Sequence, residues 1–356
     1  MVAGHERGGL VPRRQIRCAK AVRYAALMPA IPLIRASQAE PFTGALAVSG
    51  VRIEPLLEDC GIRPDIPAVD PDALVPEYAI WDLVETCAHV AGEDLFGWRI
   101  GLETPIEAIG AFGRSVGSAL TLRGALRLFL EAVGEHSSHA KFSVVPAGDH
   151  VWFCRHGIDD IDVGSWQVEQ YVLGLMVRLI RMAEGPAWAP RAVLVKQHEL
   201  GGRALPGELA SAYVQMGSRV TAIQVAARAL DRPMGSAGGE ARALEAIDVD
   251  FLGSMRLAVA PMLGTEAVGL ERAARYAGVT PRTVQRWLGR DGRSFSDVVE
   301  EVRRSQALHL LGETTLPLKA VATRLGYSDA ANFTRAFRRW TGMAPSRWRA
   351  RVASSR

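Results

Sequence analysis

The chain has 356 residues, enough for two domains at about 100 to 200 residues each. Its 48% hydrophobic and 22% charged residues exclude a disordered, collagen-like or coiled-coil protein, and no stretch has the roughly 18 uncharged apolar residues of a membrane span. Charge is unevenly divided: residues 251–356 hold 18 lysine and arginine against 8 acidic residues, net +10, whereas residues 1–250 hold 24 against 30, net −6. A polyanionic partner is therefore expected for the basic third alone.

Residues 1–30 are expected to form a disordered basic arm or an upstream extension. Several arginines precede an uncharged run, which is the order found in a signal peptide, but Pro29 and Pro32 interrupt that run. Translation from Met28 is an open alternative. The four cysteines lie far apart without a CxxC spacing, which indicates neither a disulfide framework nor a zinc site and favours a reducing cytoplasm.

Residues 31–234 have the pattern of an α+β domain in which helices precede a small antiparallel sheet. A 3.6-residue apolar period predicts a helix around Trp81 and another after Thr121, which is placed to cap it. The period then changes to two, and residues 141–145 with 151–155 predict a β-hairpin. The remaining expected elements are a helix over residues 168–182 and strands at 192–196 and 220–225.

Residues 235–250 are predicted to be a linker, because glycine and small residues dominate the stretch Arg232–Gly239. Beyond it, residues 251–349 contain one all-α architecture twice, and residues 350–356 form a tail.

In the first of the two units, a short helix ends at Gly278 and the next begins at Thr280 and Pro281. Threonine is a good helix cap, and proline suits the first helical position because its missing N–H has no intrahelical partner. A helix, a tight turn with glycine and a second helix form the helix-turn-helix outline. The second helix turns outward Arg282, Gln285 and Arg286.

The second unit repeats this outline, with Gly326 in the turn and Ser328 expected to cap the second helix. Its outward side chains are Asn332, Thr334, Arg335, Arg338 and Arg339. Ser294 and Asp297 form a capping-box-like start for the long helix that joins the units. Gly292 and Gly342 follow the second helices of the two units, at the position where a helix commonly ends in a residue with left-handed backbone conformation.

Helices with these residues suit the major groove of DNA. Arginine pairs with guanine, glutamine with adenine, and small apolar side chains contact the thymine methyl. Surrounding arginines and helix N-termini hold phosphates and set the register of the complex. A solvated basic face is the alternative for any one arginine, but two units in tandem on a strongly basic segment favour DNA. The expected phosphate contacts are Thr280, Arg290, Ser328, Arg338 and Arg339.

Residues 251–349 strongly resemble the double helix-turn-helix domain of AraC-type transcription regulators. The runs that carry this resemblance are VQRWLGRDGRSF (284–295), SQALHLL (305–311) and VATRLGYSDAANFTRAFRRWTGMAPSRWR (321–349). Residues 31–234 resemble the arabinose-binding-like N-terminal domain of one AraC subgroup. The stretches concerned are IPLIRA (31–36), LVPEYAIWDLVE (74–85), FGWRIG (96–101), IGAFGRSVGSALTLRGAL (109–126) and WAPRAV (188–193).

The resemblance implies a cytoplasmic, sequence-specific DNA-binding regulator whose N-terminal domain binds a small organic effector and forms a homodimer. The implied partners are double-stranded promoter DNA and RNA polymerase, with no membrane, no cofactor and no enzymatic activity. The family's base-reading positions fall on Arg282, Gln285 and Arg286 in the first unit and on Ala330, Ala331, Thr334 and Arg335 in the second. Both units lack the family's Ser-x-x-Glu capping box at their first helix, since Gly269 and Pro317 occupy the cap positions.

Sites in the sensing domain are harder to predict. The candidate lining of an apolar effector pocket is Trp81, Phe112, Trp152, Phe153 and Trp166, with core packing as the alternative. His136 and His139 are three residues apart, and Cys87 lies two before His89, yet neither group has the second ligand pair of a metal site, so no metal is expected.

Two alternatives to an effector-controlled regulator stay open. One is an enzyme fused to a DNA-binding domain, of a cysteine alkyl-transfer type, for which Cys87 near His89 is the candidate nucleophile. The other is a dimeric architectural DNA-binding protein that needs no ligand.

Overall fold

A computed structural model of the full chain describes residues 30–156, 165–196, 205–235, 245–266 and 268–354. The predicted arm, apart from residue 30, lies outside these ranges, as does part of the predicted linker. In the described residues no helix is both long and apolar enough to cross a membrane.

The N-terminal half opens with short elements that lead into a group of helices. In chain order they are β1 (Leu33–Arg35), η1 (Ala36–Ala39), α1 (Glu40–Val48), α2 (Glu54–Asp59), α3 (Asp65–Val69), β2 (Leu74–Pro76), α4 (Glu77–Ala91), α5 (Phe96–Glu103), η2 (Ile106–Ala108), α6 (Gly110–Gly117) and α7 (Leu122–His136). Strands β1 and β2 form a separate antiparallel pair. Thr121 caps α7, because its side chain accepts a hydrogen bond from the Gly124 N–H. Both helices expected from the 3.6-residue period are confirmed.

A five-stranded sheet follows, in the order β3-β4-β7-β5-β6. Its strands are β3 (Lys141–Ala147), β4 (His150–His156), β5 (Ala192–Leu194), β6 (Tyr213–Gln215) and β7 (Thr221–Ala226), with α8 (Ser165–Glu184) between β4 and β5. The hairpin β3–β4 is confirmed, but its strands extend further than expected, to Ala147 and from His150, and Gly148 with a positive φ of 69° allows a two-residue loop. The sheet is antiparallel except for β5–β6, which is parallel.

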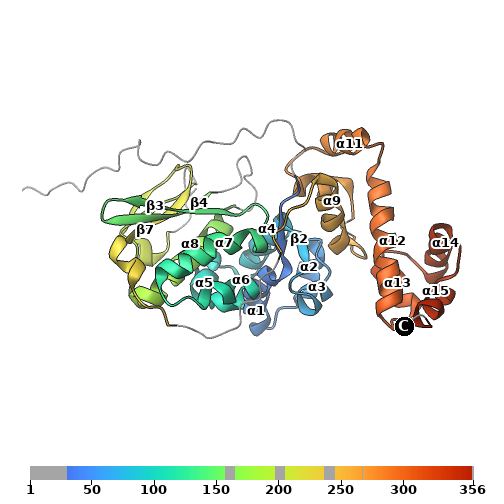
Figure 1. The fold of residues 1–356 in the computed structure, drawn as a ribbon, viewed down its shortest axis with the longest axis horizontal. Coiled ribbons are helices and arrows are strands. Elements are labelled where there is room, and N and C mark those ends of the chain that lie inside the picture. Colours follow the sequence, from blue (N-terminus) through green and yellow to red (C-terminus); the bar gives the residue numbers. More distant parts are fainter. Residues whose placement is uncertain (1–29, 157–164, 197–204, 236–244, 267, 355–356) are drawn as a thin grey trace, which may run out of the picture.

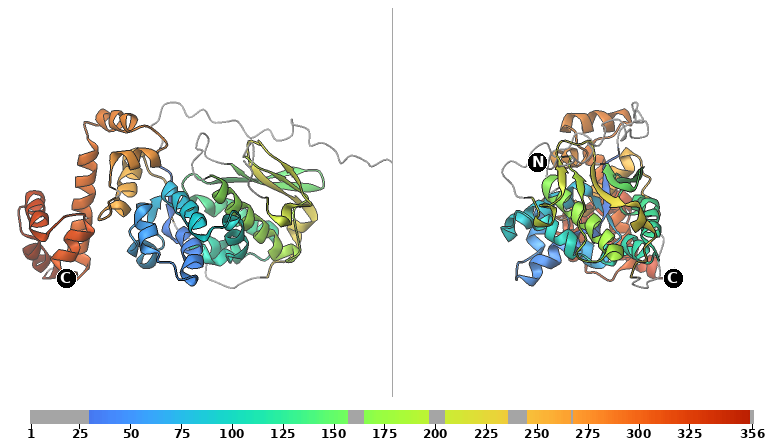
Figure 2. Two further views of the ribbon diagram at one scale, coloured as in Figure 1. Left: turned by 180° about the vertical axis from the view of Figure 1, so that it is seen from behind. Right: turned by 90° about the vertical axis from the view of Figure 1, so that its left-hand side faces the viewer.

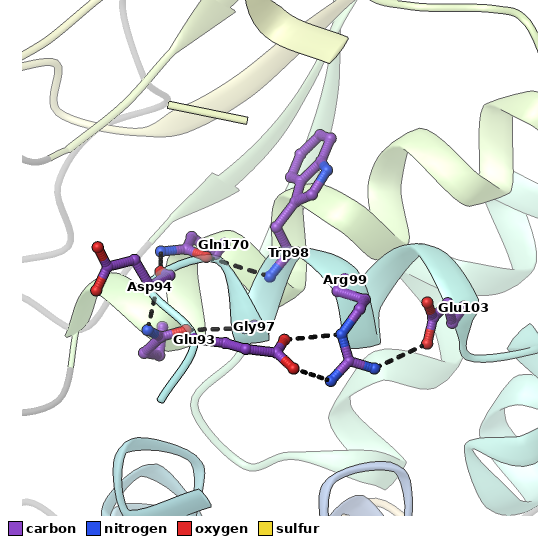
Figure 3. Close-up of polar contacts among 8 residues, drawn as sticks. Glu93, Asp94, Gly97, Trp98, Arg99, Glu103 and Gln170 are labelled. Atoms are coloured by element: carbon purple, nitrogen blue, oxygen red, sulfur yellow. Dashed lines mark hydrogen bonds and ion pairs between the residues drawn. The ribbon is translucent and has the colours of Figure 1, made fainter. Parts of the chain in front are cut away.

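Helices α5 and α8 pack unusually closely, because glycines lie where they cross. A Cβ on Gly97 would lie 2.0 Å from the Gln167 carbonyl oxygen, and one on Gly101 would lie 2.3 Å from that of Tyr171. Figure 3 shows how α8 also completes the start of α5: the Gln170 side chain accepts from the Trp98 N–H and donates to the Asp94 carbonyl. The Gln170 side chain of α8 thus takes the place of the missing cap of α5.

The C-terminal half is all helical in its described residues. Its elements are α9 (Phe251–Val259), η5 (Ala260–Met262), α10 (Leu270–Tyr276), α11 (Pro281–Arg290), α12 (Phe295–Glu313), α13 (Leu318–Arg324), α14 (Ala330–Thr341) and α15 (Pro345–Ala353). The capping box of Ser294 and Asp297 is present, and Gly292 and Gly342 have φ values of 66° and 75°. The predicted tail is wrong in part, since residues 350–353 belong to α15.

The N-terminal domain includes Pro233, which forms a β-bridge with Thr121, and Met234, which is buried. One prediction beyond this point needs correction. The end of the predicted linker is also attached to that domain, because the Ile247 N–H donates to the Gly134 carbonyl (3.2 Å).

The two halves share one buried hydrophobic cluster, which runs from α1 and α4 into α9–α14. Polar contacts reinforce the junction: the Tyr276 hydroxyl donates to the Cys60 carbonyl (2.6 Å), and the Ile31 N–H donates to Ser254 Oγ (2.8 Å). Figures 1 and 2 show α9 lying next to the N-terminal domain, whereas α14 and α15 lie beyond α12, away from it. The first helix-turn-helix unit therefore lies against the N-terminal domain, and α13 of the second unit also contacts that domain through the Arg324–Asp65 ion pair (2.9 Å).

Candidate nucleic-acid interface and buried cavity

Helix α11 presents the side chains predicted to read bases in the first unit. Thr280 caps the helix through a hydrogen bond from the Thr283 N–H (3.3 Å), and Pro281 occupies the first position, as expected. The inner face buries Val284, Trp287 and Leu288. Arg282, Gln285 and Arg286 are exposed on the opposite face, and among the described residues they have no hydrogen bond or ion pair. Their donors are therefore free for an external partner.

Helix α14 differs at the same positions. Asp329, not Ser328, caps it: Asp329 Oδ1 accepts from the Asn332 N–H (2.7 Å), and the Ser328 hydroxyl donates to Asp329 Oδ2 (3.2 Å). The prediction for Ser328 as the cap is wrong, because the carboxylate one residue later reaches the open N–H groups. Thr334 Oγ1 donates to the carbonyl of Ala330, and the Arg335 guanidinium donates to Asn332 Oδ1. Of the readers predicted on α14, Ala331 is exposed, but its methyl group can offer no hydrogen bond.

The predicted phosphate contacts lie at different places on the surface. Arg290 and Arg338 are exposed near the ends of α11 and α14. Arg339 pairs with Glu300 of α12 at 2.5 Å, and the Trp340 ring N–H donates to the same carboxylate. Arg338 is therefore a better candidate than Arg339 for a direct phosphate contact. Figure 1 shows α11 and α14 near the two ends of α12.

The N-terminal domain contains a partly open cavity of about 100 Å³ between α4, α7, α8 and the start of the sheet. Most of its wall is apolar and aromatic, with rings from Phe42, Trp81, Phe112, Phe129, Phe142 and Tyr171. Phe112 and Phe129 meet edge to face with ring centroids 5.1 Å apart, which gives the wall a fixed shape. A site of this kind, apolar with a few polar groups, is typical of small-molecule binding.

One end of the cavity is polar. Ser137 Oγ donates to Glu77 Oε2 (3.1 Å), and His136 Nε2 lies 3.0 Å from Gln38 Oε1. Arg155 forms a buried ion pair with Glu169, whose other oxygen accepts from Thr221 Oγ1. Burial raises the pKa of Glu77 to about 7, although Arg155 and Ser137 lower it, and burial lowers the pKa of His136 to about 4.

Of the five aromatic residues predicted to line a pocket, the structure brings two to this cavity, Trp81 and Phe112. Phe153 packs against Phe129 and Phe142 behind the wall. Trp152 belongs to a separate cluster with Cys154 and Leu194, and Trp166 is buried in the sheet-side core, so neither lines the cavity.

The sequence interpretation missed the polar lining, Glu77 and Arg155 above all. An acidic residue inside LVPEYAIW was a usable signal, because it stands at the first turn of a helix and the four residues that follow it, 78–81, are buried. Arg155 stood within the alternating strand β4, but only the tertiary fold shows that it faces α8.

The histidines considered as metal ligands and the cysteine considered as a nucleophile each have surroundings that do not suit that role. His136 contacts Gln38, whereas the His139 ring lies 2.8 Å from the Ser138 hydroxyl, and no group of three potential metal ligands occurs among the described residues. The Cys87 thiol is buried, and burial raises its pKa to about 12. A thiol with this pKa is a poor nucleophile.

Comparison with known proteins decides the family. A model of the arabinose-binding N-terminal domain of AraC transcription regulators matches residues 50–234, and a helix-turn-helix domain model matches residues 273–351. The chain belongs to the AraC family of transcription regulators. This assignment confirms the predicted fold class and the predicted role, a DNA-binding transcription regulator with an effector-binding N-terminal domain.

Relatives of this AraC-type chain match it along most of its length. It is 28% identical to the transcriptional regulator VirS of Mycobacterium tuberculosis over 335 residues, 89% of this chain and 96% of that protein. It is 26% identical to the ornithine utilization regulator of Pseudomonas aeruginosa over 343 residues, with the same coverage. Among solved structures, the regulator CdpR of Pseudomonas aeruginosa covers 88% of this chain and 98% of its own at 20% identity, with a TM-score of 0.40.

Proposed function

We propose that this AraC-type regulator works in the cytoplasm as a homodimer on promoter DNA, contacts RNA polymerase there, and changes its DNA affinity when a small organic molecule occupies the cavity. In this proposal Arg282, Gln285 and Arg286 are the principal base readers, and Ala331, Thr334 and Arg335 read a second site. No catalytic step is included, because the relatives are transcription regulators and the Cys87 thiol is buried.

The observation that carries effector control is the position of α4 between the cavity and the DNA-binding domain. Glu77, Trp81 and Val84 on α4 line the cavity. On another side of the same helix, the Asp82 carboxylate pairs with Arg275 of α10 at 2.5 Å. A ligand that shifts α4 must therefore also disturb the contact to the first helix-turn-helix unit, which contains α11.

Further contacts hold both helix-turn-helix units on the N-terminal domain. Arg272 of α10 donates to the Asp59 carbonyl (2.6 Å), and Arg324 of α13 pairs with Asp65 at 2.9 Å. Burial raises the pKa of Asp82, while Arg275 and Arg272 lower it. The two arginines thus favour the charged form of Asp82 and burial opposes it, so a change in the position of the arginines would change the pKa of this carboxyl.

Effector control requires a ligand with different affinities for two states of the protein, and linkage makes the effect reciprocal between ligand and DNA. The test is a thermal-shift screen of the full chain against a metabolite library, followed by operator affinity measurements with each stabilising compound. A ligand at 100 times its Kd adds about 2.7 kcal/mol to the free energy of unfolding. If no compound both binds and alters operator affinity, the ligand-independent architectural protein is the better account.

The Asp82–Arg275 pair provides a sharper prediction. In Asp82→Asn, a compound from the screen should still bind, but the factor by which it changes operator affinity is expected to fall by up to about fivefold, because a partly exposed ion pair contributes up to about 1 kcal/mol. The measurement is a DNA titration with and without the compound, for wild type and variant.

The matched control is Asp231→Asn, which breaks the exposed Arg123–Asp231 pair at the far side of the N-terminal domain. It is expected to leave the coupling factor unchanged. If the Asp82→Asn protein kept the wild-type coupling factor, α4 would not transmit the effect of the ligand to DNA binding.

A further inference from the structure

We infer that the cavity binds a small primary amine with an apolar body about the size of one ring, and that the amine's ammonium group pairs with the carboxylate of Glu77. This inference rests on the proposed function, since it names the chemical class of the effector for the same cavity.

The size of the cavity limits the ligand. Its volume of about 100 Å³ is smaller than the roughly 150 Å³ cavity that is known to hold benzene in another protein. One ring or a short branched chain therefore fills the cavity without movement of the wall. The walls that would surround this body are the aromatic rings of Phe42, Trp81, Phe112, Phe129 and Tyr171.

The charges around the cavity favour a cation. Arg155 and Glu169 form a mutual ion pair, and their side chains are 8% and 7% exposed. Glu77 is also buried, at 4% exposure, its hydrogen-bond donor Ser137 is neutral, and the cation that lowers its pKa, Arg155, is already paired with Glu169. A buried carboxyl without its own cation is costly when ionised. A cationic ligand would supply the missing charge, whereas a carboxylate ligand would add a second anion beside Glu77.

The geometry around Glu77 suits an ammonium group in particular. Trp81 follows Glu77 by four residues on α4, so both side chains lie on one face of the helix and both line the cavity. A hydrogen bond from the Trp81 side chain also lowers the pKa of Glu77, so a cation bound to the carboxylate would lie close to this ring. Tyr171 also lines the cavity; its hydroxyl is buried beside the Gln38 side chain, and its oxygen can accept one of the ammonium protons.

The test uses three probes of one shape that differ in charge: benzylamine, benzyl alcohol and benzoate, titrated calorimetrically into the full chain. Benzylamine is expected to bind at least about tenfold more tightly than benzyl alcohol, because a hydrogen bond to a charged group contributes about 1.5 kcal/mol or more. Benzoate is expected to bind most weakly. Equal affinity for the amine and the alcohol, a preference for benzoate, or no binding of benzylamine would overturn the inference.

The pH dependence of benzylamine binding provides a second readout. Glu77 has a pKa of about 7 and should be mostly protonated at pH 6 and mostly ionised at pH 8. The groups that face it do not change charge in this window: the His136 pKa of about 4 leaves it neutral, burial raises the pKa values of Tyr78 and Tyr171, and Arg155 stays paired with Glu169. Benzylamine affinity is therefore expected to rise about tenfold from pH 6 to pH 8. A flat profile would contradict the pairing with Glu77.

The variant Glu77→Gln keeps the shape of the side chain and removes its charge. It is expected to lose the preference for benzylamine over benzyl alcohol and the pH dependence, while Glu131→Gln on the exposed side of α7 keeps both. Since burial raises the folded-state pKa of Glu77, its ionisation destabilises the fold as pH rises towards 7, and Glu77→Gln should be at least as stable as wild type at pH 8. A variant that retains the amine preference would refute the inference. Operator affinity is not read in this experiment, so its failure leaves the coupling through Asp82 to be judged separately.

Discussion

Replacing Arg286 with alanine is expected to lower affinity for the best operator by about 5- to 150-fold, which corresponds to about 1–3 kcal/mol for one bidentate base contact. Arg286 is exposed on α11, and its guanidinium forms no hydrogen bond or ion pair with a described residue, so its donors can reach a base edge in the major groove. The loss should be confined to one base pair: against a set of operators changed one position at a time, the variant should show a flattened preference at that position alone.

Arg338→Ala is the matched control, because Arg338 is exposed on the last turn of α14 and is assigned to a phosphate. It should weaken binding to all operators alike and reduce the slope of log affinity against log salt by about 0.9. If Arg286→Ala behaved in the same way, with base preferences unchanged, Arg286 would be a phosphate anchor and α11 would not be the principal reader.

The two units are expected to contribute unequally for reasons visible in α14. Its cap is a carboxylate, Asp329, which repels the phosphate backbone, and Arg335 already donates to Asn332. The Thr334 hydroxyl donates to its own helix, which leaves methyl groups for thymine contacts. Helix α11 has a neutral threonine cap and three unpaired long donors, so discrimination by hydrogen bonds should come mainly from the first unit.

Gly101→Ala is expected to destabilise the N-terminal domain by about 1–3 kcal/mol or more, the range for overpacking a close contact. The added methyl would lie 2.3 Å from the Tyr171 carbonyl oxygen and 3.0 Å from the Gly174 Cα, and both of these are backbone atoms of α8. Neither can move aside as a flexible side chain would, so α5 and α8 must separate. Urea unfolding, followed by circular dichroism, measures the change.

Gly134→Ala on α7 is the control, because nothing lies within 4 Å of the position that its methyl would occupy. It should be neutral or stabilising by up to about 1 kcal/mol, the difference in helix propensity between alanine and glycine. A Gly101→Ala protein as stable as wild type would show that α5 and α8 are not in such close contact.

Local sequence signals predicted the elements well, because each rests on interactions between near neighbours in the chain. The Ser294–Asp297 box, the Thr121 and Thr280 caps and the β3–β4 hairpin all depend on residues a few positions apart. The same reasoning went wrong at Ser328, where two adjacent residues could each cap the helix and the stronger acceptor, Asp329, took the position.

Features that depend on distant residues were out of reach. The ion pair of Asp82 with Arg275 joins residues 193 positions apart, and no periodicity in either segment reveals it. The cavity likewise combines Gln38, Glu77 and Arg155 from different elements, and its aromatic wall has the same composition as an ordinary core. Aromatic content alone therefore placed Trp152 and Trp166 in a pocket they do not line.

The central claim is that this chain reads DNA sequence through both α11 and α14. Helix α12 has 19 residues, about 28 Å at 1.5 Å per residue, whereas successive major grooves on one face of DNA are about 34 Å apart. The most direct measurement is selection of bound sequences from random DNA by the full chain, followed by footprinting of the enriched sites. Two protected blocks about one helical turn apart are expected in each recognised site, with some bending of the DNA between them. No enriched sequence, or a single short block, would contradict the claim.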